Sequence, residues 1–142
     1  MSGANRDTFL AFDFGSQSIG VATGSGDGGL ATPLSAVRVF RSGPDWNDID
    51  RMVEEWKPVA FVVGLALNAR GEHTSSSLKA QEFGRRLGQR YNRPVHWMNE
   101  TLSTEAARRA LQGTDPGRRP RKADIDNAAA ALILESFLDS QR

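Results

Sequence analysis

The sequence predicts an α/β fold, in which one mixed five-stranded sheet, built from an antiparallel hairpin and parallel strands, carries helices on both faces. Two short apolar segments near the N-terminus, Phe9 to Phe14 and Ile19 to Thr23, flank a Gly/Ser turn and indicate a β-hairpin. Strand-like and helix-like segments then alternate along the chain. The apolar, β-branched run from Val59 to Leu65 is typical of a parallel strand buried on both faces.

The first half of the chain supplies the hairpin, a third strand and a helix. The third strand is predicted over Leu34 to Phe40. Asp45 is expected to cap a helix whose apolar residues recur at helical spacing. Lys57-Pro58 ends that helix, because proline disfavours helical backbone at the residue before it.

The second half alternates helices with strands. A loop is predicted from Asn68 through the serines to Ser77, and the next elements are a helix over Leu78 to Tyr91, a strand over Val95 to Glu100, and helices over Thr104 to Gln112 and Ala123 to Leu138. A hairpin followed by this alternation is the ribonuclease-H-like topology. In that topology the strand ending at Glu100 is expected inside the sheet.

Composition sets the class of protein. With 142 residues, 39% hydrophobic and 25% charged, the chain fits a single globular domain over 1–142, with an ordered core at about 8–139. The longest apolar run is too short to cross a bilayer, and the polar N-terminus lacks a secretory pattern, so we expect a cytoplasmic protein without membrane contact. The absence of cysteine excludes disulfides and thiolate metal sites.

The formal net charge of +1 gives no overall attraction to polyanions. Contact with nucleic acid must therefore come from local clusters of Arg and Lys. Two such clusters are present, at 85–93 and at 118–122.

Three acidic residues are the candidate catalytic groups: Asp13, Glu100 and Asp126. Asp13 lies within an apolar strand, where a carboxylate is costly unless it is paired or binds a metal, although a turn-capping role is the alternative. Glu100 ends a strand where open α/β sheets usually locate their sites, and a solvated strand-end residue is its alternative. Asp126, in the first turn of the last helix, has helix-dipole compensation as its alternative.

Convergence of these acids would form an all-oxygen site for Mg²⁺ or Mn²⁺. The mechanism that we expect is two-metal hydrolysis of a phosphodiester. One ion lowers the pKa of the attacking water and the other stabilises the leaving 3′-oxygen.

Several polar residues near these acids are candidate substrate-binding groups. Ser16 and Gln17 in the hairpin turn are predicted to contact backbone phosphate, and Asn68 and Arg70 lie in a long loop beside the site. The basic loop before the last helix adds further phosphate contacts, from Arg119, Arg121 and Lys122. Ordinary solvation is the alternative for each of these groups.

Four sequence blocks carry a resemblance to a known family. They are Ala11-Phe-Asp-Phe-Gly-Ser-Gln-Ser-Ile-Gly-Val-Ala22, Val62-Val-Gly-Leu-Ala-Leu-Asn68, Asn99-Glu-Thr-Leu-Ser-Thr104 and Lys122-Ala-Asp-Ile-Asp-Asn-Ala-Ala129. Together, and in this order, they resemble the YqgF family of Holliday-junction resolvase-like nucleases, over nearly the whole chain from Phe9 to Leu138.

The resemblance implies a ribonuclease-H-like fold and an acidic triad at Asp13, Glu100 and Asp126. It also implies a nuclease that matures the 5′ end of pre-16S ribosomal RNA, with resolution of branched DNA junctions as the alternative. The expected partner is nucleic acid, pre-rRNA first and branched DNA second. The protein itself is expected to be a monomer or a weak homodimer.

Departures from the family pattern keep other readings open. Gln17 and Ser18 stand where the family usually has a basic residue, and Asn99 and Thr101 replace an acid and an arginine. A catalytically weakened nucleic-acid-binding module is therefore an alternative to the enzyme. The Asp-Phe-Gly-Ser step also resembles the phosphate motif of sugar kinases and actin-like proteins, but those close two such domains around a nucleotide.

Overall fold

A computed structural model describes residues 7–26, 30–100 and 122–141, and it describes the side chains of the last segment from residue 128 onward. Its strands and helices are β1 (Thr8–Phe14), β2 (Ser18–Ser25), β3 (Ala31–Pro33), β4 (Val37–Phe40), β5 (Gly43–Pro44), α1 (Trp46–Trp56), β6 (Ala60–Leu65), α2 (Ser75–Tyr91), β7 (Val95–Asn99) and α4 (Lys122–Ser140).

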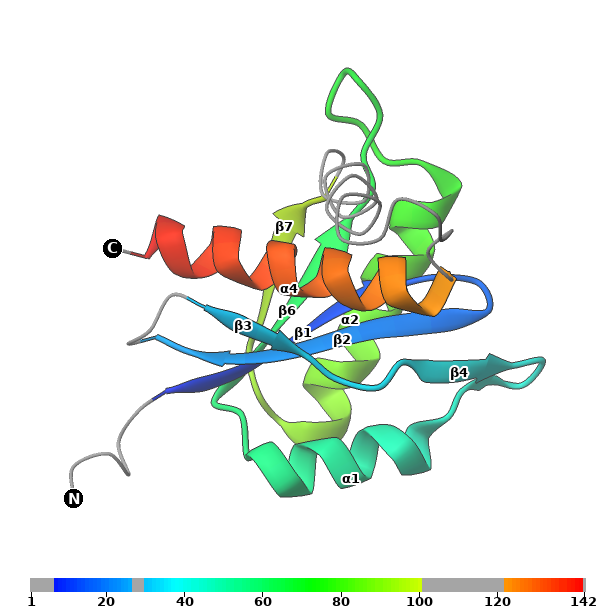
Figure 1. Cartoon of the computed structure of the whole chain (residues 1–142). Helices are drawn as coiled ribbons and strands as arrows, with labels where there is room; N and C mark the ends of the chain where they lie inside the picture. Colours follow the sequence, from blue (N-terminus) through cyan, green and yellow to red (C-terminus); the bar gives the residue numbers. More distant parts are fainter. Residues whose placement is uncertain (1–6, 27–29, 101–121, 142) are drawn as a thin grey trace, which may run out of the picture.

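One mixed sheet organises these elements, in the order β5-β4-β2-β1-β6-β7, with β3 paired to β2. The hairpin is antiparallel and places Asp13 opposite Gly20, whereas β6 runs parallel to both β1 and β7. The helix α4 crosses one face of the sheet, and α1 and α2 cover the other (Figure 1). The predicted mixed sheet with helices on both faces is confirmed.

The side-chain alternation of β1 divides the core into two layers. Leu10 and Phe12 pack with residues of α1 and α2, while Ala11 packs with the α4 residues Ile133 and Leu134. Successive residues of a strand point to opposite faces, so Asp13 belongs to the α4 face of β1. The fold thus brings an acidic side chain under α4.

The sheet has seven strands rather than the five predicted from the sequence. The predicted strand over 34–40 is shorter, because only Val37–Phe40 forms β4. Two further strands are very short: β3 pairs Ala22 with Pro33, and β5 forms a tight hairpin with β4 in which Gly43 has a φ of 127°. A positive φ favours glycine, so the Gly-Pro step closes this hairpin before α1 begins.

Helix α1 begins and ends as predicted. The Asp45 side chain accepts a hydrogen bond from the Asp48 amide, and Lys57 ends the helix in a left-handed conformation. The loop predicted through Ser77 is wrong at its end, because α2 already begins at Ser75. Thr74 caps it and forms a reciprocal pair of hydrogen bonds with Ser77, the two-sided cap that stabilises a helix start.

The strand before Glu100 lies at the edge of the described sheet, not inside it, because β6 is the one partner that the sheet order gives to β7. Trp97 of this strand is correspondingly 38% exposed. Helix α4 extends the predicted 123–138 by one residue at its start and two at its end. The helix predicted over 104–112 lies outside the described residues. Within the described part of the chain, no helix combines the length and apolarity needed to cross a bilayer.

Candidate functional site

Asp13 is buried near the carboxyl end of β1. The residue is 7% exposed and belongs to a strand whose other residues, apart from Thr8, are apolar. The hairpin register and the alternation of β1 place it on the face that α4 covers. The predicted setting, a carboxylate within an apolar strand, is therefore confirmed.

Glu100 follows directly after β7 and is equally buried, with 6% of its surface exposed. Its backbone amide donates to the Leu65 carbonyl at 2.9 Å, which fixes the chain at the carboxyl end of β6. Its Oε2 atom finds no hydrogen-bond partner among the described residues. A buried carboxylate oxygen without a donor is costly, and this is the chemical state expected of a ligand for a cation.

Gly64 of β6 lies between these two acids. A Cβ atom at this position would stand 3.2 Å from both the Cβ and the carboxyl carbon of Glu100, and 2.5 Å from Cδ1 of Ile133. The Glu100 side chain therefore lies against the bare backbone of Gly64. On the other side, Phe12 pairs with Val63, so Asp13 is the β1 residue next to Gly64 as the two strands continue.

Gly64 is the site residue that sequence reasoning missed. An isolated glycine in a buried, β-branched strand is a signal of close approach by another group, and the Val-Val-Gly-Leu run carries that signal. The strands β1 and β7 are the two neighbours of β6, each about 4.8 Å from it, so Asp13 on β1 and Glu100 just after β7 approach Gly64 from its two sides.

The third predicted acid, Asp126, lies in α4. Its backbone is seven residues, or two helical turns, before Ile133, the residue that packs over Gly64. The side chains of Asp126 and Lys122 fall outside the described set, and Arg119 and Arg121 lie outside the described residues altogether. The roles of these four residues stay predictions.

The hairpin turn lies at the same end of β1 as Asp13. Ser16 and Gln17 are both exposed there, and the Gln17 carbonyl accepts a hydrogen bond from the Val39 amide at 3.1 Å. Their side chains are available to a ligand near the carboxylates. Their predicted contact with phosphate stays a prediction.

The loop after β6 is organised by Asn68. Its Oδ1 accepts hydrogen bonds from the amides of Arg70, at 2.8 Å, and Glu72, at 3.0 Å, and its Nδ2 donates to Oε1 of Glu72 at 3.1 Å. Asn68 thus holds the loop in shape, and the exposed Arg70 side chain is one of several in this loop that reach solvent. Substrate binding by either residue stays a prediction.

The donor set suits a hard divalent cation. Asp13 and Glu100 offer carboxylate oxygens, which Mg²⁺ and Mn²⁺ prefer, and the unpartnered Glu100 Oε2 is the oxygen that a cation would satisfy. No group of three or more acidic or histidine side chains forms a cluster within the described set. The described residues therefore offer two candidate ligands, and a third candidate has to come from beyond them.

Comparison with known proteins identifies the family. A family model described as "RuvX: Holliday junction resolvase" matches residues 7–140. The chain belongs to the RuvX family. A relative from Pseudomonas paraeruginosa (strain DSM 24068 / PA7), named "Putative pre-16S rRNA nuclease", is 44% identical over 131 residues, covering 91% of this chain and 90% of its own.

A second relative, from Escherichia coli O1:K1 / APEC, carries the same name. It is 41% identical over 132 residues, which cover 93% of this RuvX-family chain and 96% of the relative. Among solved structures, Thermus thermophilus RuvC in complex with a Holliday junction substrate superposes with a TM-score of 0.53 at 15% identity, covering 95% of each chain. That likeness confirms the ribonuclease-H-like fold predicted from the sequence.

Proposed function

We propose that this RuvX-family chain is a divalent-metal-dependent nuclease that processes the 5′ end of pre-16S ribosomal RNA. The observation that carries the proposal is the buried Glu100 carboxylate, whose Oε2 lacks a partner among the described residues. Its side chain packs against Gly64, and the strand register puts Asp13 next to that glycine on β1. The names of the relatives at 41–44% identity support the choice of substrate.

In this proposal, Asp13 and Glu100 are ligands of Mg²⁺ or Mn²⁺, and Asp126 is the third ligand. The chemistry that such cations supply when bound is Lewis acidity toward the attacking water and the leaving 3′-oxygen. We propose two cations, because three carboxylates offer more oxygens than one Mg²⁺ needs beside its waters and a substrate phosphate.

The remaining residues position the substrate and restrict water. Packing of Ile133 over Gly64 closes the apolar side of the site, so Asp13 and Glu100 would act in a low-dielectric setting that strengthens their attraction for a cation. Ser16 and Gln17 in the adjoining turn would hold a backbone phosphate. Arg119, Arg121 and Lys122 would hold the phosphates that follow.

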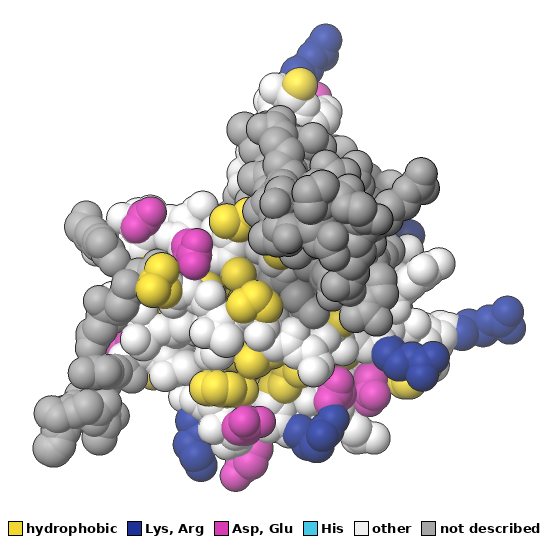
Figure 2. Space-filling model, viewed as in Figure 1, with side chains coloured by type: hydrophobic (Ala, Val, Ile, Leu, Met, Phe, Trp, Pro, Cys, Tyr) yellow, Lys and Arg dark blue, Asp and Glu magenta, His cyan; other side chains and the backbone are white. Residues whose placement is uncertain are grey.

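Positive charge does not dominate every surface. On the α4 side, the described residues show acidic and basic side chains intermingled with apolar ones (Figure 2). Affinity for a nucleic acid therefore requires cations gathered elsewhere on the molecule.

A Holliday junction resolvase is the second candidate, because the family model carries that description. Both candidates use the same phosphodiester chemistry and differ in the shape of the nucleic acid. A nucleic-acid-binding module with weakened catalysis is the third, favoured by Gln17 and Asn99.

The test is Mn²⁺- or Mg²⁺-dependent cleavage of a single-stranded RNA that spans a 16S precursor 5′ end, with a four-way DNA junction as competitor. Asp13→Asn should lower the cleavage rate by roughly two to three orders of magnitude, the loss typical when one preorganised charge is removed from a site. Asp7→Asn makes the same change at the exposed start of the chain segment leading into β1 and should cleave like the wild type.

The outcomes separate the three candidates. RNA cleavage that disappears in Asp13→Asn supports the proposal. Preferential cutting of the junction favours the resolvase. Binding of either nucleic acid without metal-dependent cleavage favours the binding module and contradicts the enzyme.

A further inference from the structure

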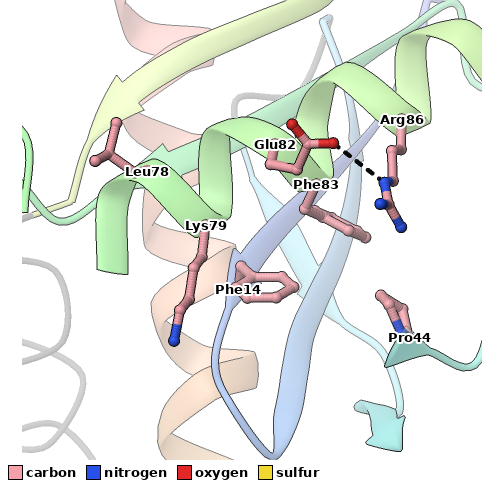
Figure 3. Close-up of a pocket in the computed structure, with 7 residues that line it drawn as sticks. All are labelled: Phe14, Pro44, Leu78, Lys79, Glu82, Phe83 and Arg86. Atoms are coloured by element: carbon pink, nitrogen blue, oxygen red, sulfur yellow. Dashed lines mark hydrogen bonds and ion pairs between the residues drawn. The ribbon is translucent and has the colours of Figure 1, made fainter. Parts of the chain in front are cut away.

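A cavity of about 360 Å³ lies on the face of the sheet opposite α4. Phe14 and Pro44 border it on the strand side, and one side of α2 borders it on the other (Figure 3). The α2 residues recur at helical spacing and so share that side of the helix: Leu78, Lys79, Glu82, Phe83 and Arg86. The volume lies at the lower end of the range of ligand-binding pockets.

Aromatic rings form the floor of the cavity. The Phe14 and Phe83 rings lie 5.2 Å apart, centre to centre, at 36° to each other. Phe83 is only 3% exposed and is held from behind by Trp46, stacked at 5.7 Å, and by the edge contact of Phe12 at 5.4 Å. The floor is therefore rigid, and the partly exposed Phe14 ring offers a face to a ligand.

Cations stand at the rim. Lys79 lies beside Phe14, and Arg86 lies across the opening, where its Nε donates to Oε2 of Glu82 at 3.2 Å (Figure 3). Arg86 also borders a neighbouring hollow of about 390 Å³ that Trp46 and Arg90 line with it. Lys79 and Arg86 thus form a cationic strip along α2, whereas Arg90 is already paired with Asp50. A strip of this kind matches a phosphate backbone.

The cavity is lined by the residue that follows Asp13 in the sequence. Phe14 directly follows Asp13, and the alternation of β1 sends the two side chains to opposite faces at the same end of the strand. A nucleic acid that is bound at Asp13 and continues around the hairpin turn would reach the mouth of the cavity. Leu78, 53% exposed at the rim, is an apolar side chain that such a ligand would cover.

From this arrangement we propose that the cavity binds an unstacked base of the nucleic acid that is cut at the carboxylates, while the cationic strip holds the adjoining phosphates. The inference rests on the proposed nuclease function for the identity of its ligand. Single-stranded nucleic acid is commonly held in this way, with bases on aromatic side chains and the backbone on Arg and Lys. A purely apolar partner would gain nothing from Lys79 and Arg86.

The experiment measures binding of a fluorescent single-stranded RNA by anisotropy, with divalent metal chelated so that no cleavage occurs. Phe14→Leu keeps the apolar volume and removes the aromatic face, so it should weaken binding by roughly 5- to 30-fold. Phe9→Leu is the matched control, because Phe9 is also a partly buried ring on β1, on the face toward Phe137, and it should bind like the wild type.

A second pair of variants tests the cationic strip without disturbing the core. Arg86→Ala should lower the salt dependence of binding by about one phosphate contact. Arg51→Ala should leave it unchanged, although Arg51 is also exposed and ion-paired within its own helix, to Asp48. The wild type should bind RNA with an abasic site more weakly than intact RNA. Phe14→Leu should bind the two RNAs with equal affinity, because it lacks the aromatic face on which the base would stack.

Equal RNA affinity of wild type and Phe14→Leu overturns the inference. Sedimentation velocity of Leu78→Gln gives a second check. A changed oligomeric state with unchanged RNA affinity also overturns the inference and assigns the cavity to an interface between copies of the chain. Failure of the nuclease proposal looks different: the wild type then shows no cleavage with metal restored, while Phe14→Leu still weakens binding.

Discussion

Asp50 and Glu100 are carboxylates in two regions of the molecule, and their surroundings differ. Asp50, on α1, receives hydrogen bonds from Arg90 Nε at 3.0 Å, from Arg90 Nη2 at 2.9 Å and from the Tyr91 hydroxyl at 2.5 Å. These hydrogen bonds, of which the one from Arg90 has the largest effect, hold the pKa of Asp50 below its ordinary value. Glu100 is far more buried, yet its Oε2 has no partner among the described residues.

We interpret the difference as that between a structural carboxylate, Asp50, and the proposed metal ligand Glu100. The Asp50 cluster joins α1 to α2. Both Asp50 oxygens already accept hydrogen bonds, so the cluster contributes to stability and Asp50 is not a free ligand for a cation. The Oε2 atom of Glu100 is buried without a donor among the described residues, a cost to stability that proteins tolerate where the group serves a site. The comparison predicts opposite responses when each carboxylate is made neutral.

Replacing Glu100 by Gln should give the largest effect. Cleavage should fall by roughly 10²- to 10³-fold, because a neutral amide binds a divalent cation poorly. The metal-free protein should at the same time gain about 1 kcal/mol in the free energy of unfolding, since a buried charge without a donor is removed.

Kinetics and urea unfolding on the same preparation check both halves of this prediction. Glu135→Gln is the control, because the Glu135 carboxylate already accepts a hydrogen bond from the Ala31 amide at 3.1 Å and should gain no stability on neutralisation. A loss of stability in Glu100→Gln would show that the Glu100 carboxylate has hydrogen-bond or ionic partners in the metal-free protein, and would contradict its role as a metal ligand.

Replacing Gly64 by Ala should have the next largest effect. The new methyl group would press on Cδ1 of Ile133 and on the Glu100 carboxyl, so we expect a loss of about 1–3 kcal/mol in unfolding free energy and roughly tenfold slower cleavage. Adding Ile133→Val removes the methyl at 2.5 Å and should recover most of the stability without recovering the rate.

Gly84→Ala supplies the control for Gly64→Ala. A methyl group there would stand 2.6 Å from Cζ3 of Trp97, so it should cost comparable stability away from the carboxylates and leave cleavage at saturating RNA unchanged. Equal activity losses in both variants would reduce the role of Gly64 to packing alone.

Much of the architecture could be predicted from the sequence, because long periodic segments carry it. The helices α1 and α4 and the buried strand β6 follow from apolar spacing. The strands β3 and β5 could not be predicted, since three and two residues are too few to show alternation, and both depend on pairing with β2 and β4. The early start of α2 depends on the Thr74–Ser77 cap. The sequence predicts a loop there instead, because three consecutive serines are typical of loops.

The site was predictable in part for the same kind of reason. Asp13 stands out as a lone acid in an apolar strand, and Glu100 stands at a strand end. The position of Glu100 against Gly64 and Ile133 could not be predicted, because it joins three segments that are distant in the sequence. The edge position of β7 depends likewise on tertiary pairing.

The smallest effect should come from Asp50→Asn. The lowered pKa means that the stability contributed by the Asp50 charge is present above the ordinary Asp pKa and is lost as the pH falls through the lowered value. Asp50 and Arg90 are both about two-fifths exposed, so the loss should be modest at neutral pH and weaker in high salt. Thermal unfolding should therefore show the variant and wild type converging in acid, with cleavage unchanged; a difference that grows in acid would contradict the assignment.

The most direct test of the central claim, that Asp13 and Glu100 together bind a catalytic cation, is a calorimetric titration of the folded protein with Mn²⁺. We expect saturable binding by the wild type and by Asp7→Asn, and binding at least about tenfold weaker in Asp13→Asn and in Glu100→Gln. Wild-type affinity in both variants would contradict it and place the metal elsewhere.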